Sequence, residues 1–136
     1  MRRTAMHEKR LPDAELEVMK ALWDAGQPLT RTQLETRLAG HNWASTTLLA
    51  LLARLEAKGC VSRSRQGRGY LYSAALSRRE YLPVESRSAL SRLFEGSAKN
   101  LIAAMAESDA LSDRDIDELE AYLARLKAGR GGAHQD

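Results

Sequence analysis

The sequence predicts a mainly helical protein with an N-terminal winged helix-turn-helix domain and a C-terminal domain of three helices. Up to residue 75, three amphipathic helical patterns are followed by two β-prone runs around a glycine-rich turn. From residue 76 onward, only helical patterns occur. Three helices followed by a two-stranded hairpin are typical of the winged helix, since a plain three-helix bundle has no need of the hairpin.

Composition excludes several classes of protein. Of the 136 residues, 43% are hydrophobic and 29% are charged, which is the balance of a soluble globular chain. No apolar run has the length of a membrane span or follows the basic N-terminus as a signal-peptide core, so we expect a cytoplasmic protein. One cysteine, Cys60, and three scattered histidines provide neither a disulfide framework nor a ligand set. We therefore expect no metal and no cofactor.

Charge is distributed unevenly along the chain. The net charge is +3, but residues 1–75 carry 12 Lys and Arg against 7 Asp and Glu, whereas residues 76–136 carry 9 against 11. The basic first part suggests a polyanionic partner, and the mildly acidic second part suggests a different task.

The first predicted helix covers residues 13–25. Val18 and Leu22 lie one turn apart in its apolar stripe. Gly26 suits a C-cap, and Pro28 prevents the helix from continuing.

Two further helices form the expected helix-turn-helix. The second, at residues 31–39, begins with a capping box in which Thr30 pairs with Gln33. The third begins near Ser45 or Thr46 and ends at Lys58. Its leucines recur at helical spacing and form a buried face: Leu48, Leu51, Leu52 and Leu55.

Short extended segments complete the first domain. Leu29 is expected to be an extended link before the second helix. Residues 60–65 and 70–73 are β-prone and flank a glycine-rich turn, which predicts a hairpin.

Helices are predicted in the C-terminal part at residues 77–95, at residues 97–106, and from Ser112 to about residue 128. Pro83 lies in the first two turns of the first of these, where it either kinks the helix or delays its start. Apolar residues of the last helix repeat at intervals of three and four, like the seam of a coiled coil. The predicted domains are thus a flexible basic arm, a winged helix, a helical dimerisation domain and a flexible tail: residues 1–10, 11–75, 76–128 and 129–136.

Few large side chains are available to give this C-terminal part a core of its own, so we expect it to form a homodimer. The alternative is that its helices fold back on the winged helix. The residues assigned to the dimer interface are Leu90, Leu93, Phe94, Leu101, Ile102, Met105, Ile116, Leu119, Leu123 and Leu126.

The third helix is expected to read DNA with the face opposite its leucines. A recognition helix offers its N-terminal outward residues to base edges in the major groove. Here these are small hydroxyl and apolar side chains, which suit close approach and contact with thymine methyl groups: Ser45, Thr46, Thr47, Leu49 and Ala50. Basic side chains that suit phosphates lie at the start of the second helix and on the hairpin: Arg31, Arg63, Arg65 and Arg68.

Other interpretations explain these residues singly but not as a group. Leu49 alone is explained as a surface leucine, and any one arginine as a solvated charge. A winged helix used only for protein contacts is the main alternative, but it needs no basic wing. An enzyme is not indicated, because the acidic run at residues 113–120 follows a helix cap, where carboxylates need no catalytic role. Cys60 is expected to be a buried small side chain rather than a redox switch.

Five segments resemble the penicillinase-repressor (BlaI/MecI/CopY) family in their residues, order and spacing. They are LPDAELEVMKALW (11–23), LLARLEAKG (51–59), GRGYLY (67–72), FEGS (94–97) and LSDRDIDEL (111–119). The resemblance covers residues 11–127. It implies a homodimeric transcriptional repressor that binds a dyad operator in double-stranded DNA upstream of β-lactamase or other stress genes.

The same resemblance implies a means of induction and some differences from the family. In antibiotic-responsive members, a membrane sensor-protease triggers cleavage in the C-terminal domain, in the region that aligns with Ala104 and Met105. The typical Asn-Phe pair is absent there. Pro12 and Ala44 replace hydroxyl capping residues, and residues 45–46 replace a Pro-Lys pair, which alters the expected operator preference. The C-terminal cysteine cluster of the copper-responsive branch is absent, which excludes copper sensing.

Overall fold

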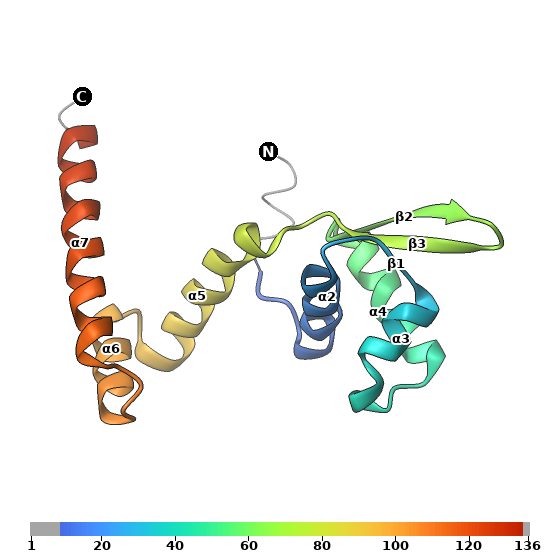
Figure 1. The fold of residues 1–136 in the computed structure, drawn as a ribbon, viewed down its shortest axis with the longest axis horizontal. Coiled ribbons are helices and arrows are strands. Elements are labelled where there is room, and N and C mark those ends of the chain that lie inside the picture. The colour runs from blue at the N-terminus through green and yellow to red at the C-terminus, as the bar shows by residue number, and fades with distance from the viewer. Residues whose placement is uncertain (1–8, 135–136) are drawn as a thin grey trace. The chain divides into compact units, whose positions relative to one another are not determined.

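The computed structural model describes the backbone of residues 9–134 and the side chains of residues 9–130 (Figure 1). Two compact units are present, one ending at Ala89 and one beginning at Leu90. The elements of the first unit are α2 (Asp13–Ala25), β1 (Leu29–Thr30), α3 (Arg31–Arg37), the 3₁₀ helix η1 (Ala39–His41), α4 (Ser45–Ala57), β2 (Val61–Gln66), β3 (Gly69–Ala74) and most of α5 (Arg78–Phe94). The second unit holds the end of α5, α6 (Ala98–Glu107) and α7 (Asp113–His134). The predicted fold class, a winged helix followed by helices, is confirmed.

α2 has the predicted bounds and buries the predicted face. Val18 and Leu22 are both buried. The helix ends because Gly26 adopts a φ of 67°, in the left-handed region, and its N–H bonds to the Leu22 carbonyl. At the other end, Pro12 provides no side-chain cap, as its residue type implies.

α3 and α4 form the helix-turn-helix. The predicted capping box is present, since the Gln33 N–H donates to Thr30 Oγ1 at 3.1 Å and the Thr30 N–H donates to Gln33 Oε1 at 2.9 Å. α3 ends at Arg37, short of the predicted residue 39, because the chain tightens into η1 and then turns at Asn42, which has a φ of 56°. α4 begins directly after Ala44, which provides no side-chain cap.

The sheet contains three antiparallel strands in the order β1-β3-β2. β2 and β3 form the predicted hairpin, and its two-residue turn begins with Gly67 at a φ of 61°, a conformation that glycine adopts without strain. Where the sequence predicts only an extended link, β1 pairs Leu29 with Tyr72. Two residues are too few to show the alternation of a strand, so the sequence pattern does not reveal this pairing.

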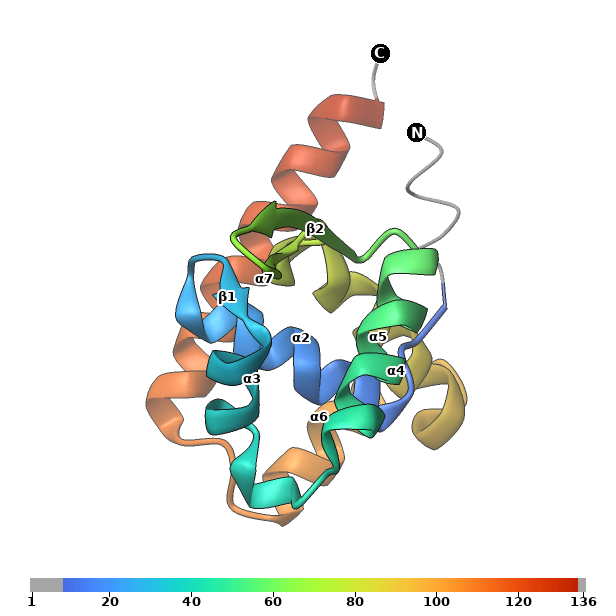
Figure 2. The ribbon, with the colours of Figure 1, turned by 90° about the vertical axis from the view of Figure 1, so that its right-hand side faces the viewer.

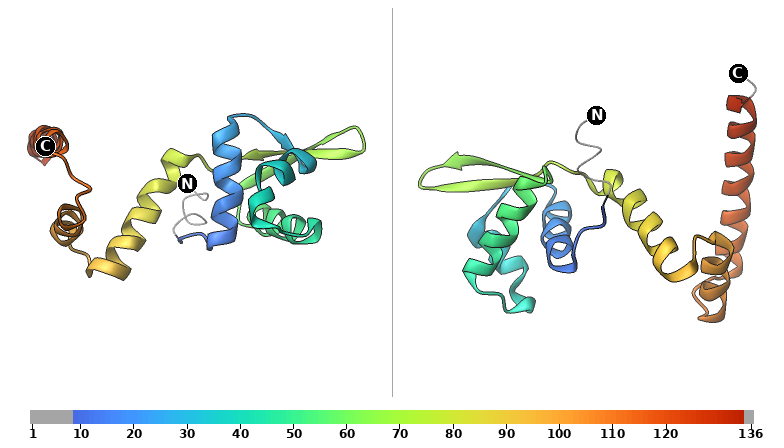
Figure 3. Two further views of the ribbon diagram at one scale, coloured as in Figure 1. Left: turned by 60° about the horizontal axis from the view of Figure 1, so that its bottom comes forward. Right: turned by 180° about the vertical axis from the view of Figure 1, so that it is seen from behind.

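α2, α3 and α4 lie on one side of this sheet, and the hairpin of β2 and β3 projects past them (Figures 1 and 3). Figure 2 shows the same unit along the hairpin, with α3 and α4 on either side of the view and the sheet above them. The space between them is filled by leucines of the helices and by Val61 and Tyr72 of the hairpin, which form a single core.

The first turns of α5 belong to the first unit, which ends at Ala89. Leu76 and Tyr81 are each 1% exposed. The Tyr81 hydroxyl accepts a hydrogen bond from the Leu11 N–H and donates one to Glu85, each at 2.7 Å. Burial and the hydrogen bond to that carboxylate raise the pKa of Tyr81 to about 12. These contacts join distant parts of the chain, which helical periodicity does not reveal.

α6 and α7 each begin with a serine cap. Ser97 Oγ accepts from the Asn100 N–H at 3.0 Å. Ser112 and Asp115 cap each other's backbone N–H at 3.0 Å, and these bonds lower the pKa of Asp115. α7 continues to His134, past the predicted helix end at 128, because glycine lowers helix propensity without preventing backbone hydrogen bonds.

Residues 1–8 of the predicted basic arm lie outside the described part of the chain, as do residues 135–136. Its last two residues are described, and Arg10 Nη2 forms an ion pair with Asp13 at 2.7 Å. Pro83 lies inside α5 and does not delay the start of that helix. Within residues 9–134, no helix is both long and apolar enough to cross a membrane.

Candidate nucleic-acid interface

α4 exposes the face that the sequence assigns to DNA. The four leucines of its predicted inner face, Leu48, Leu51, Leu52 and Leu55, are buried, Leu55 completely. The N-terminal residues of the opposite face are exposed: Ser45, Thr46, Thr47, Leu49 and Ala50. Leu49 is 42% exposed although it is large and apolar, so the core does not require it. The predicted orientation of α4 is confirmed, while contact of these side chains with DNA stays a prediction.

A groove of about 540 Å³ lies beside this face. Its lining comes from the start of α3, from α4 and from the hairpin: Thr30, Arg31, Thr32, Leu49, Arg63, Gln66, Arg68, Gly69, Tyr70 and Tyr72. Four of the nine residues predicted to contact DNA therefore meet in one groove, three of them arginines. The predicted contacts that lie outside its lining are Thr46, Thr47, Ala50 and Arg65, and Ser45 lines a neighbouring hollow at the turn between α3 and α4.

The hairpin arginines are held against a tyrosine. The Arg63 guanidinium lies 4.2 Å from the centre of the Tyr70 ring, and that of Arg65 lies 5.4 Å away. Arg65 Nη1 donates to the Tyr70 hydroxyl at 3.4 Å, and this bond with the two positive charges lowers the pKa of Tyr70. Arg63 also pairs with Glu56 of α4 at 3.2 Å. Among the described side chains, those of residues 9–130, Arg68 has no ion pair or side-chain hydrogen bond, so its charge is available to a phosphate.

Arg31 and Ser45 share one carboxylate. Arg31 Nη1 lies 2.7 Å from Glu35 Oε2, and Ser45 Oγ lies 2.6 Å from the same oxygen. The hydrogen bond from Ser45, with the guanidinium beside it, lowers the pKa of Glu35. The carboxylate is therefore ionised at neutral pH and connects the first turn of α3 to the first turn of α4.

Sequence reasoning missed both Tyr70 and Glu35. Tyr70 pairs with Arg65 across the hairpin, so the predicted hairpin with its turn at 66–69 was enough to find it. Glu35 follows Arg31 by four residues, a spacing that indicates an ion pair on a helix. Its contact with Ser45 depends on the packing of α4 and has no signal in the sequence.

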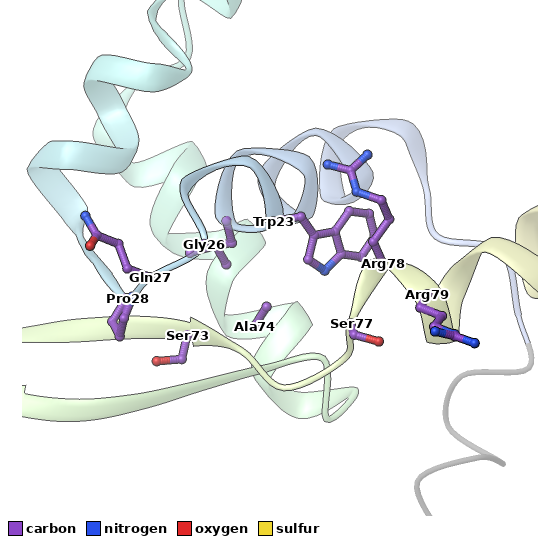
Figure 4. A pocket seen from close by; sticks show the side chains of 10 residues that line it. Trp23, Gly26, Gln27, Pro28, Ser73, Ala74, Ser77, Arg78 and Arg79 are labelled. Carbon is purple, nitrogen blue, oxygen red and sulfur yellow. The ribbon is translucent and has the colours of Figure 1, made fainter.

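A second hollow, of about 480 Å³, lies at the end of α2 beside the segment that joins β3 to α5 (Figure 4). The Trp23 indole N–H donates to the Leu76 carbonyl at 2.8 Å. Arg78 stacks at 5.4 Å from the Trp23 ring and pairs with Asp24 at 2.6 Å. These polar groups are already paired within the protein, so they indicate no ligand.

The predicted dimer residues all lie in α5, α6 and α7, and none is buried within the described chain. Leu93 is 66% exposed and Leu123 is 55% exposed. Ile102 and Ile116 are exposed too, and the others are half-buried: Leu90, Phe94, Leu101, Met105, Leu119 and Leu126. The residues that align with the cleavage region, Ala104 and Met105, lie in the helical backbone of α6.

Cys60 and the acidic residues at the start of α7 were the other candidates for a reactive or ligand-binding role. Cys60 is buried, and burial raises the pKa of its thiol, so its reactive thiolate form is disfavoured. Asp113 and Asp115 lie in the first turn of α7, where their charges favour the helix. Among the residues whose positions are described, no group of His, Cys, Asp and Glu is arranged to hold a metal ion.

A helix-turn-helix with an exposed second helix, beside a hairpin that carries arginines, defines a winged-helix domain of the nucleic-acid-binding kind. Residues 11–125 match the penicillinase repressor family, so this chain belongs to that family. It is therefore a transcriptional regulator and not an enzyme.

Two known regulators are similar to it in sequence along most of its length. The penicillinase repressor of Bacillus licheniformis is 31% identical over 122 residues, which are 88% of this chain and 95% of that protein. The transcriptional regulator BlaI of Mycobacterium tuberculosis is 32% identical over 123 residues, 90% of this chain and 88% of that protein. The solution structure of monomeric Bacillus licheniformis BlaI with the blaP half-operator aligns at a TM-score of 0.46 and 28% identity, covering 54% of this chain and 89% of that chain.

Proposed function

We propose that this protein represses transcription by binding, as a homodimer, to a dyad operator in double-stranded DNA. The observation that carries the proposal is the groove that Arg31, Arg63 and Arg68 line together with the exposed Leu49 of α4. An apolar side chain on an exposed helix suits thymine methyl groups, and the surrounding cations suit the phosphates on either side.

Each part of the surface has a separate task in this proposal. The first two turns of α4 enter the major groove, where Thr46 and Ala50 approach base edges closely because they are small. Arg68, at the tip of the hairpin, neutralises a phosphate or enters the minor groove. A DNA partner also agrees with the cytoplasmic location predicted from the sequence.

Dimerisation is supported by the apolar surface of the second unit. No described side chain of this unit is buried, so its helices alone do not gain enough burial energy to offset the conformational entropy lost on folding. Leu93 and Leu123 are the most exposed of the large hydrophobic residues in this unit. A second copy of the same helices would cover both with matching side chains, and symmetric dimers of this kind are the commonest oligomers.

The similarity to known repressors suggests which kind of gene this protein regulates. Because the chain is similar to a penicillinase repressor over nearly its full length, we propose a resistance gene of the β-lactamase type or another stress gene as its target. A membrane sensor-protease that cleaves near Ala104 and Met105 remains a prediction. α6 is helical there, and proteases require an extended chain, so cleavage would first require α6 to open locally.

DNA selection tests the proposal directly. A pool of duplexes with a random central sequence is incubated with the full chain, and bound DNA is recovered and sequenced over several rounds. We expect an inverted repeat to emerge, with affinity that falls steeply as salt rises. Recovery of no preferred sequence, or of a single half-site, contradicts the proposal.

The variant Ala50→Glu tests whether α4 contacts the selected DNA. The new carboxylate on α4 faces phosphates and base acceptors, so affinity for the selected sequence is expected to fall by about 4 kcal/mol or more. Helix propensity changes little, so the melting temperature is expected to stay near that of the parent. Ala121→Glu, the same change at an exposed position of α7, is the control and is expected to bind normally. Normal binding by Ala50→Glu would mean that α4 does not read DNA.

A further inference from the structure

The hydroxyl of Ser45 donates a hydrogen bond to the carboxylate of Glu35. Ser45 Oγ lies 2.6 Å from Glu35 Oε2, a length typical of a strong hydrogen bond from a hydroxyl to a carboxylate. An ionised carboxylate only accepts hydrogen bonds, and a serine has a single hydroxyl proton. The Ser45 proton must therefore point at Glu35.

This hydrogen bond determines whether Ser45 donates or accepts a hydrogen bond when it meets DNA. Because its proton points at Glu35, the Ser45 oxygen has only lone pairs left, so toward any other group it is an acceptor. Arg31 Nη1 lies 3.5 Å from this oxygen. A phosphate oxygen needs a donor and is not served by such an oxygen. In the major groove, the amino groups of adenine and cytosine are donors, whereas guanine N7 and O6 and thymine O4 are acceptors.

We propose that Glu35 is a specificity-determining residue, which orients the Ser45 hydroxyl so that Ser45 accepts a hydrogen bond from the amino group of an adenine or a cytosine. The inference rests on the proposed function, since it requires the first turn of α4 to lie in the major groove. It adds that a side chain which touches no DNA selects one base in each half-site.

The first test compares two carboxylate variants in the DNA selection. Glu35→Ala frees the Ser45 proton, so the hydroxyl both donates and accepts. We expect preference for adenine or cytosine at one position of each half-site to weaken by about 3- to 10-fold, the value of one hydrogen bond. Binding to random DNA is expected to strengthen, because a negative charge has left the surface.

Glu56→Ala is the matched control. Glu56 also pairs with an arginine of this surface, Arg63, at 3.2 Å, but it has no hydrogen bond to a serine among the described residues. Its removal is expected to strengthen binding to random DNA in the same way and to leave the base preference unchanged. Unchanged base preference in Glu35→Ala, or an equal loss in Glu56→Ala, overturns the inference.

The second test removes the amino group from the DNA. At the selected position, adenine is replaced by purine, or cytosine by pyrimidin-2-one, and affinity is measured for the parent and for Ser45→Ala. We expect the parent to lose about 3- to 10-fold and Ser45→Ala to lose nothing further. An equal loss in both proteins overturns the inference, and this test does not depend on the folding of Glu35→Ala. A parent that selects no sequence at all contradicts the proposed function instead.

Discussion

The two units of the chain bury their apolar residues in opposite ways. In the first unit, hydrophobic side chains from Leu11 to Tyr81 form one continuous core. In the second, no described side chain is buried, and Leu93 and Leu123 are more than half exposed. Both units contain amphipathic helices. In the first unit, a sheet and loop residues such as Leu11 and Leu76 cover the apolar faces of those helices.

The comparison shows that amphipathic helices alone do not give a unit a buried core. The first unit closes its core with contacts far apart in sequence, such as the pairing of Leu29 with Tyr72 and the bond from Leu11 to Tyr81. The second has short connections and no covering layer among its described residues. In the proposed function, a second copy of the chain provides the surface that stabilises this unit.

Breaking the second unit is expected to have the largest effect. Leu123→Asp places a charge on the apolar seam of α7, so the dimer should dissociate in sedimentation experiments. Affinity for the selected dyad should fall by about 100- to 10,000-fold, because the two half-sites are then bound independently. Ala121→Asp, on the other face of α7, is the control and should remain dimeric. A tight dimer in Leu123→Asp contradicts the assigned interface.

Breaking the first unit is expected to act on folding. Leu55→Ala removes a completely buried side chain of α4 and should lower the free energy of unfolding by about 2–5 kcal/mol. Leu49→Ala is the matched control on the same helix and should change it by less than about 0.5 kcal/mol. Chemical denaturation measures both. Equal effects would mean that α4 is packed on its other face.

The junction of α5 with the winged helix is expected to contribute less. Tyr81→Phe removes the hydroxyl between Leu11 and Glu85 and should cost about 1–2 kcal/mol. Since the folded-state pKa of about 12 exceeds the ordinary value, the neutral tyrosine stabilises the fold below about pH 10, and this contribution is lost as the pH rises toward 12. Unfolding measured at about pH 8 and pH 11 should therefore show a smaller difference between parent and variant at the higher pH. A constant difference contradicts the assigned role.

The smallest effect is expected on the DNA side of the first unit. Arg68→Ala should weaken binding to selected and random duplexes alike by several-fold and should lower the salt slope by about one. Dimerisation and unfolding should not change, because Arg68 lies in the exposed hairpin turn. Gel shifts over a series of salt concentrations provide the measurement. A loss confined to the selected sequence would mean that Arg68 reads a base.

Much of the first unit was predictable because its elements have local signals. The bounds of α2, the capping box of Thr30 and Gln33, the buried leucines of α4 and the glycine turn of the hairpin follow from spacing over a few residues. The same signals place the exposed face of α4 correctly. They also predict too short an α7, since local propensity at Gly129 disfavours a helix that the structure continues.

The sequence by itself determined the order of helices, the hairpin, the basic character of the first unit and the family, because each depends on residue type and short-range periodicity. Only the tertiary structure decided that β1 joins the sheet, that Tyr81 belongs to the core and that Glu35 holds Arg31 and Ser45 together. These contacts form between elements separated along the chain, and their energy depends on how whole elements pack. Periodicity shows which face of an element is buried, but it does not show which other element covers that face.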